Sequence, residues 1–130
     1  MTTDLTMLVW TALLCVAMPV TYLVGRTLAP GGTRWGLGNR DTVLEVPAWT
    51  GRAYRAHMNL LENIAPFAVL VLVAHVTGRA NATTALGATI FFWARVAYAA
   101  VYIAGIVGLR TAVFFVAAFG ELLILFQLLG

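Results

Sequence analysis

The sequence predicts an all-α membrane protein: a four-helix transmembrane bundle in a single domain over residues 1–130. Hydrophobic residues make up 62% of the chain and charged residues only 10%, whereas about 25% of a soluble domain is charged. Four apolar runs approach the ~20 residues that a helix needs to cross a bilayer. They are too long and too uniformly apolar to be the alternating strands of a membrane β-barrel.

The first expected span covers residues 5–24. The segment before it contains Asp4 and no lysine or arginine. It therefore lacks the basic start of a secretory signal, and we expect the run to be retained as a membrane helix. Pro19 lies within this span and is expected to bend it, because proline removes a helical hydrogen bond. Cys15 is the only cysteine and is expected to be a small packing residue.

Residues 25–51 are expected to form a long loop. Turn-forming sequences, PGG at 30–32 and GLGNRD at 36–41, lie within it. The basic residues in or beside this loop are Arg26, Arg34, Arg40 and Arg52. Because arginine-rich connections stay on the cytoplasmic side of a membrane, we predict a cytoplasmic loop with both termini on the opposite side.

The rest of the chain contains three further apolar runs. They cover residues 52–76, 83–107 and 110–129. Arg95 interrupts the second of these three runs, and Glu121 interrupts the third. Short connections near residues 78–81 and near Gly108 join them. The chain is therefore expected to be an integral, multi-pass membrane protein.

Polar residues occupy one face of the 52–76 span, in its cytoplasmic half. Arg55, Asn59 and Glu62 stand at i, i+4 and i+7, which places them on the same side of a helix. Charged and amide side chains are costly inside a bilayer and rarely occur there without a partner or a function. This face is a candidate polar site between helices.

The 83–107 span carries a matching polar face. Arg95, Tyr98 and Tyr102 stand at i, i+3 and i+7, again on one side of a helix. Arg110 begins the last span on the same side of the membrane. Three helices thus bring polar groups to one layer of the bilayer.

Two interpretations of this layer remain open. Glu62 and Arg95 are expected to form a structural ion pair, with Glu121 as the competing partner of Arg95. The groups left over form a cationic, hydroxyl-bearing pocket: Arg55, Asn59, Tyr98, Tyr102 and Arg110. Such a pocket suits a small anionic ligand, while the bilayer supplies a lipophilic second substrate. Alternatively, the same groups only join helices and anchor them at the interface.

Other classes of function are not supported by the sequence. No basic patch with interleaved aromatic residues indicates nucleic-acid binding. His57 and His75 stand apart from any carboxylate or cysteine cluster, so no metal site is expected. His57 also lies off the main polar face and is expected to be a packing residue rather than a base.

The sequence RAYRAHMNLLENIAPF at 52–67 closely resembles the motif of the membrane-associated proteins in eicosanoid and glutathione metabolism, the MAPEG family. The likeness is greatest to the microsomal glutathione transferase branch, and GLGNRD suggests a bacterial-type member. The resemblance implies a homotrimer in the bacterial cytoplasmic membrane, with glutathione as co-substrate between neighbouring subunits and no metal.

By the same resemblance, each polar position receives a role. The positions that match glutathione contacts are Arg55, Asn59, Glu62, Tyr98 and Tyr102. Arg110 matches the catalytic arginine that stabilises the glutathione thiolate, since a nearby cation lowers the pKa of a thiol. The implied reaction is thiolate attack on a lipophilic electrophile or reduction of a lipid hydroperoxide.

Two alternatives belong to other classes. One is a non-catalytic family member that binds lipid or serves as an accessory subunit of a larger membrane complex. The other is a small four-span multidrug exporter. Exporters of that kind use a glutamate in the first span, and residues 5–24 contain none, which makes this alternative the weaker one.

Overall fold

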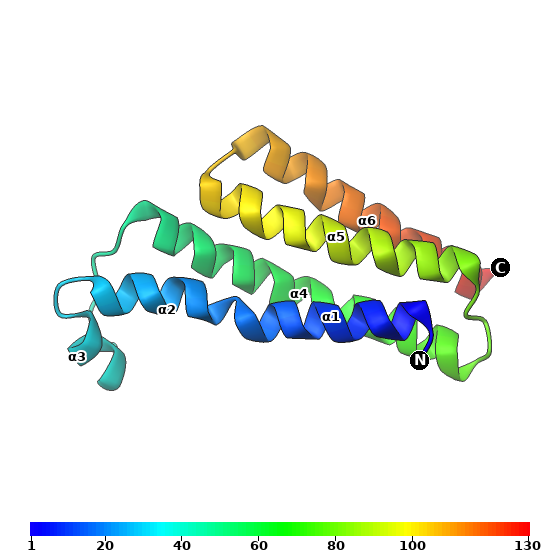
Figure 1. Ribbon diagram of the computed structural model, residues 1–130, viewed down its shortest axis with the longest axis horizontal. Coiled ribbons are helices and arrows are strands. Elements are labelled where there is room, and N and C mark those ends of the chain that lie inside the picture. Colours follow the sequence, from blue (N-terminus) through cyan, green and yellow to red (C-terminus); the bar gives the residue numbers. More distant parts are fainter.

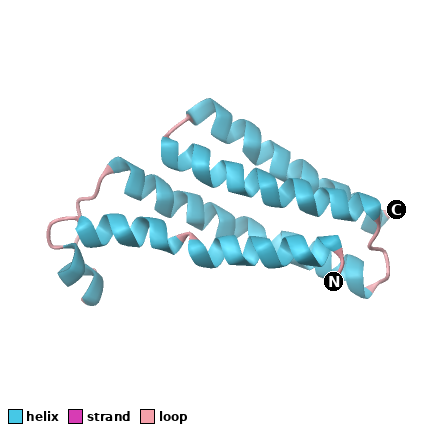
Figure 2. Ribbon diagram, in the orientation of Figure 1, coloured by secondary structure: helices cyan, strands magenta, loops and turns pink.

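The computed structural model describes residues 1–130 as six helices without strands (Figures 1 and 2). They are α1 (Thr3–Ala17), α2 (Pro19–Leu28), α3 (Gly32–Leu37), α4 (Ala48–Val76), α5 (Ala82–Ala104) and α6 (Val107–Leu129). Taken together, α1 and α2 form one span, so four segments are long and apolar enough to cross a membrane. The predicted all-α class with four spans is confirmed.

The first span is interrupted at Met18, directly before Pro19. Pro19 begins α2, and because it has no N–H group, the helical hydrogen-bond ladder is broken at this point. The first span is therefore interrupted where Pro19 was expected to bend it. Pro66, in contrast, lies inside α4 without ending it, as membrane helices tolerate.

The connection between the first two spans is more ordered than expected. The helix α2 continues to Leu28, and the six-residue α3 lies within the segment that was expected to be a loop. Gly31 adopts a φ of 73° between them, a left-handed conformation that glycine reaches without steric cost. The helix α3 consequently folds back at the end of the molecule (Figure 1).

The turn between the last two spans lies at Gly105 and Ile106, rather than near Gly108. Gly105 has a φ of 83° and ends α5. The N–H groups of Gly105 and Ile106 both donate to the carbonyl of Val101, at 3.1 Å each, which closes a left-handed C-cap. Arg110 therefore lies inside the first turn of α6 instead of beginning the helix.

Glycine allows α5 and α6 to approach each other closely. A Cβ atom placed on Gly120 would lie 2.6 Å from the carbonyl oxygen of Gly87 and 2.9 Å from the backbone nitrogen of Phe91. Small residues at membrane helix interfaces let backbones pack in this way. Next to this contact, Phe91 of α5 stacks on Phe67 of α4, with ring centroids 4.0 Å apart. This stacking joins the α5–α6 hairpin to the rest of the bundle.

The two termini lie at one end of the bundle, opposite α3 (Figure 1). At that end Thr84 Oγ1 donates a 2.6 Å hydrogen bond to the buried carboxylate of Asp4, which ties α1 to α5. Asn81 caps α5 and also donates to Gln127 at 2.8 Å. The polar pocket described below lies toward the other end.

We expect Gly120→Ala to destabilise the bundle by about 1–3 kcal/mol, because the added methyl group overpacks the α5–α6 contact. The free energy of unfolding of the purified protein in detergent measures the effect. Gly108→Ala is the matched control on the same helix, since nothing lies within 4 Å of a Cβ atom there. Equal stability of the two variants would contradict the close-packing interpretation.

Candidate functional site

The polar residues singled out in the sequence line one open pocket of about 370 Å³. Its lining consists of Arg55, Met58, Asn59, Glu62, Tyr98, Tyr102 and Arg110. The helical spacing within α4 and α5 accounts for this convergence, because residues three and four apart share a face. The structure therefore brings together all six residues expected to bind or activate glutathione, and adds Met58.

Tyr102 lies between two guanidinium groups. Arg55 Nε donates a 3.2 Å hydrogen bond to the Tyr102 hydroxyl. The Arg110 guanidinium carbon lies 4.6 Å from the centre of the Tyr102 ring, a cation–π distance. Neither arginine forms an ion pair with a carboxylate of the chain. Each keeps N–H donors that can bind a carboxylate or a thiolate.

Arg95 lies beneath the pocket and is almost completely buried, with 2% of its surface exposed. Its Nη2 donates a 2.6 Å hydrogen bond to Asn59 Oδ1, and its guanidinium carbon lies 4.5 Å from the Tyr98 ring centre. Because the side-chain oxygen Oδ1 of Asn59 accepts this hydrogen bond from Arg95, the side-chain N–H₂ group of Asn59 remains as the donor for a ligand.

The expected structural ion pair between Glu62 and Arg95 is not formed within the single chain. Glu62 is exposed, and the partner of Arg95 is the amide of Asn59. The competing carboxyl, Glu121, has a buried Oε1 without a hydrogen-bond partner, as has Arg95 Nε. The Glu62–Arg95 pair therefore stays a prediction.

His57 belongs to another part of the molecule. Its Nδ1 lies 2.9 Å from the Tyr22 hydroxyl and its Nε2 lies 3.7 Å from Cys15 Sγ. Both partners come from the first span, so the imidazole is buried between α1, α2 and α4. It does not line the polar pocket, in agreement with the packing role expected from its position on the helix.

Two smaller pockets adjoin the polar one through shared residues. One, of about 200 Å³, lies at the α5–α6 turn and includes Arg52, Tyr102 and Arg110. Arg52 Nε donates to the carbonyl of Ile103 at 2.9 Å. Sequence reasoning missed Arg52 as a pocket residue. Its position at the start of the 52–67 motif does not indicate that its side chain reaches the end of α5.

The second adjoining pocket is largely aromatic. It has a volume of about 170 Å³ and shares Tyr98 and Arg110 with the polar pocket, adding Thr111, Phe114 and Phe115. Phe115 is 65% exposed on the outer surface of the bundle, where it would meet lipid. Arg110 thus lies where polar and apolar surfaces join.

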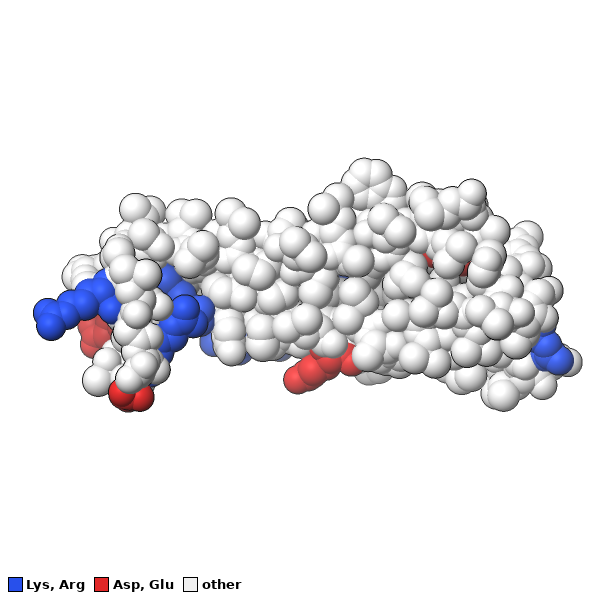
Figure 3. All heavy atoms as spheres, turned by 90° about the horizontal axis from the view of Figure 1, so that it is seen from below, with Lys and Arg blue, Asp and Glu red and all other residues white.

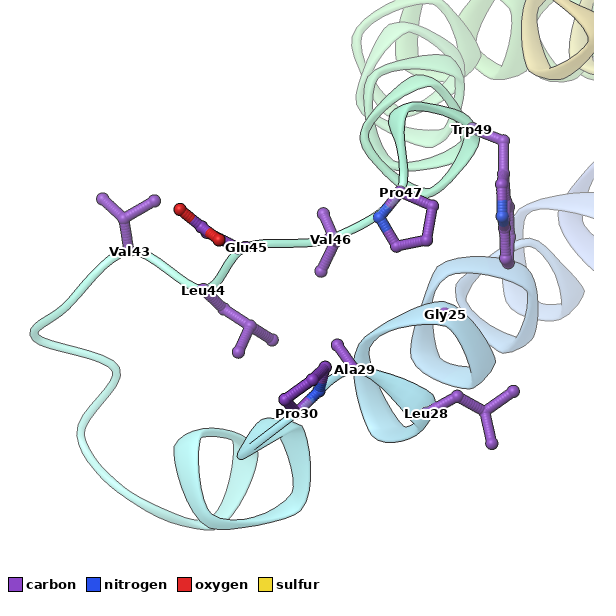
Figure 4. Close-up of a pocket in the computed structure, with 10 residues that line it drawn as sticks. All are labelled: Gly25, Leu28, Ala29, Pro30, Val43, Leu44, Glu45, Val46, Pro47 and Trp49. Atoms are coloured by element: carbon purple, nitrogen blue, oxygen red, sulfur yellow. The ribbon is translucent and has the colours of Figure 1, made fainter.

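The largest cavity, of about 750 Å³, lies elsewhere, between the end of α2 and the segment before α4. Figure 4 shows Leu44 extending from this segment toward Pro30, while the Glu45 carboxylate points away from the helices. The lining contains no arginine, lysine or histidine. This cavity therefore offers no positive charge to an anionic ligand.

A model of the MAPEG family matches residues 6–130, nearly the whole chain, so the protein belongs to the MAPEG family. No curated protein matches the sequence. The family match confirms the resemblance inferred from the motif at the start of the 52–76 span. The protein is thus a multi-pass membrane protein of the family of glutathione and eicosanoid metabolism.

We expect Asn59→Leu to lower the free energy of unfolding by about 1.5–3 kcal/mol, because the buried Arg95 guanidinium loses its hydrogen-bond acceptor. Denaturant unfolding in detergent measures this loss. Asn63→Leu is the matched control: it adds the same apolar surface to α4, but Asn63 donates only within its own helix, to the Asn59 carbonyl oxygen at 2.7 Å and its Oδ1 at 3.4 Å. If the two variants unfold alike, Arg95 does not depend on Asn59.

Proposed function

We propose that this MAPEG member is a glutathione-dependent membrane transferase or peroxidase that acts on lipophilic electrophiles or lipid hydroperoxides. The observation that carries the proposal is the position of Arg110. Its guanidinium group lies beside Tyr102 in the polar pocket and also borders the aromatic pocket that contains Phe115. A cation at such a junction suits an anionic sulfur that must meet an apolar substrate.

Glutathione combines two carboxylates, an ammonium group and a thiol, and the polar pocket offers complementary groups. The fork of Arg55 suits a carboxylate, and the exposed carboxylate of Glu62 suits the ammonium group. The side-chain N–H₂ group of Asn59, whose Oδ1 is hydrogen-bonded to Arg95, supplies a fixed donor for a peptide carbonyl. These assignments use the free hydrogen-bonding groups that the single chain leaves in the pocket.

Arg110 would stabilise the thiolate of the bound glutathione. A neighbouring cation lowers a thiol pKa and so raises the thiolate fraction at neutral pH. The thiolate then attacks an electrophilic carbon, forming a carbon–sulfur bond as the leaving group departs with the displaced electron pair. Alternatively it attacks the terminal oxygen of a hydroperoxide and breaks the O–O bond, giving a sulfenic acid and an alkoxide that takes up a proton to become an alcohol. A second glutathione then converts the sulfenic acid to the disulfide and water.

The second substrate would enter from the bilayer through the aromatic pocket. Phe114 and Phe115 line that pocket beside Arg110, and their rings favour apolar ligands over water-soluble ones. Lateral access from lipid is also consistent with an Arg110 that is only half-buried.

We also propose that the protein works as a homotrimer in the bacterial cytoplasmic membrane, with the α2–α4 connection in the cytoplasm. The polar pocket is open on the side of α4 that bears the exposed Glu62. A carboxylate facing lipid would be costly, whereas a neighbouring subunit would cover it and close the pocket around glutathione.

Titration of the purified protein with glutathione tests the proposal. The ultraviolet difference absorbance at about 240 nm follows thiolate formation, which depends on the lowered thiol pKa. We expect a saturable signal in the wild-type protein and its loss in Arg110→Ala. Arg55→Ala should weaken binding by about tenfold, the effect of losing one charge-assisted hydrogen bond.

Arg34→Gln serves as the control, because Arg34 is exposed on α3 and lines none of these pockets. It should titrate as the wild type does. A flat trace for correctly assembled wild-type protein would refute glutathione activation and favour another thiol or the accessory-subunit function. Retention of the thiolate signal in Arg110→Ala would remove Arg110 from the proposed mechanism.

A further inference from the structure

A second cationic site lies where the first span ends, away from the polar pocket. The guanidinium carbon of Arg26 lies 4.8 Å from the ring centres of both Tyr22 and Tyr54, and 5.4 Å from that of Trp35. Aromatic faces thus surround the arginine and hold it in place. Basic atoms gather at this end of the molecule, which carries α2 and α3 (Figure 3).

The hydrogen-bonding capacity of Arg26 is not used by the protein. Its neighbours are three rings, and it forms neither an ion pair nor a hydrogen bond with a protein acceptor. Arg40 lies close by, 5.3 Å above the Trp35 ring, and donates only to the carbonyl of Gly36, at 3.3 and 3.4 Å. Two guanidinium groups are therefore positioned without a counter-ion.

Both arginines line a pocket of about 260 Å³. Thr27 and Thr33 add hydroxyl groups to its lining, while Leu23 and Leu37 add apolar surface. The carboxylates nearest in sequence, Asp41 and Glu45, do not line it. The lining thus combines donors for an anion with exposed aliphatic side chains.

The position in the membrane identifies the ligand. Arg26 occupies the last turn of α2, where the first span ends, and a tryptophan ring such as that of Trp35 is typical of the membrane interface. We propose that this pocket, the α2–α3 corner, binds the phosphate of an anionic phospholipid headgroup. Arg26 and Arg40 clamp the phosphate oxygens.

The aliphatic side chains explain why the ligand is a lipid rather than a soluble phosphate. Leu23 is 57% exposed and Leu37 is 86% exposed, so both can contact the glycerol and upper acyl chain. The cytoplasmic leaflet carries the negative surface charge that attracts such arginines. The α2–α3 corner shares no residue with the polar pocket, so lipid binding does not depend on the proposed glutathione activity.

Native mass spectrometry of the full-length protein in detergent tests the α2–α3 corner. The protein is titrated in parallel with phosphatidylglycerol, phosphatidylcholine and inorganic phosphate. We expect tight retention of phosphatidylglycerol alone. Arg26→Gln should weaken that binding by about tenfold, because one charge-assisted interaction with the phosphate is lost.

Arg34→Gln removes an equal charge from the exposed side of α3, outside the pocket, and should change the affinity by no more than about twofold. Arg40→Gln should weaken phosphatidylglycerol binding as much as Arg26→Gln does. It provides the test if the Arg26→Gln protein does not assemble. If Arg34→Gln weakened phosphatidylglycerol binding as much as Arg26→Gln, the loss would come from general surface charge and not from the α2–α3 corner. Equal retention of phosphatidylcholine, or of inorganic phosphate, would overturn the proposal.

Discussion

The buried guanidinium group of Arg95 is the constraint on which the arrangement of the other polar residues depends. A charge in the interior of the membrane costs several kcal/mol unless the protein bonds to it. Asn59 provides the bond from α4, and Tyr98 provides an aromatic face from one turn further along α5. The two helices must therefore keep one register. That same register brings the free donors of α4 opposite the tyrosines of α5.

The sequence was sufficient to predict the class, the four spans and six of the seven residues that line the polar pocket. Hydropathy identifies spans because lipid admits few charges, and helical spacing fixes which side chains share a face. The partner of Arg95 was beyond this reasoning, because it depends on how far α4 is rotated against α5. The turn at Gly105 was misplaced to Gly108 since both glycines stand in one apolar stretch, and only the backbone angle distinguishes them.

Met58 and Arg52 illustrate a second limit of sequence reasoning. Met58 lines the polar pocket because it stands three residues after Arg55 and four before Glu62, on the same face of α4. It was passed over because it is apolar. Arg52 reaches the end of α5, where its Nε donates to the carbonyl oxygen of Ile103. The position of Arg52 depends on how α4 packs against α5, which neither hydropathy nor periodicity contains.

The glycine contact between α5 and α6 has a mechanical consequence. With Gly87 and Gly120 backbone against backbone, these two helices pack more extensively on each other than on any other element. We expect the α5–α6 hairpin to move as one rigid body, so that Tyr98, Tyr102 and Arg110 move together. The width of the polar pocket should then depend on one motion, the tilt of the α5–α6 hairpin against α4.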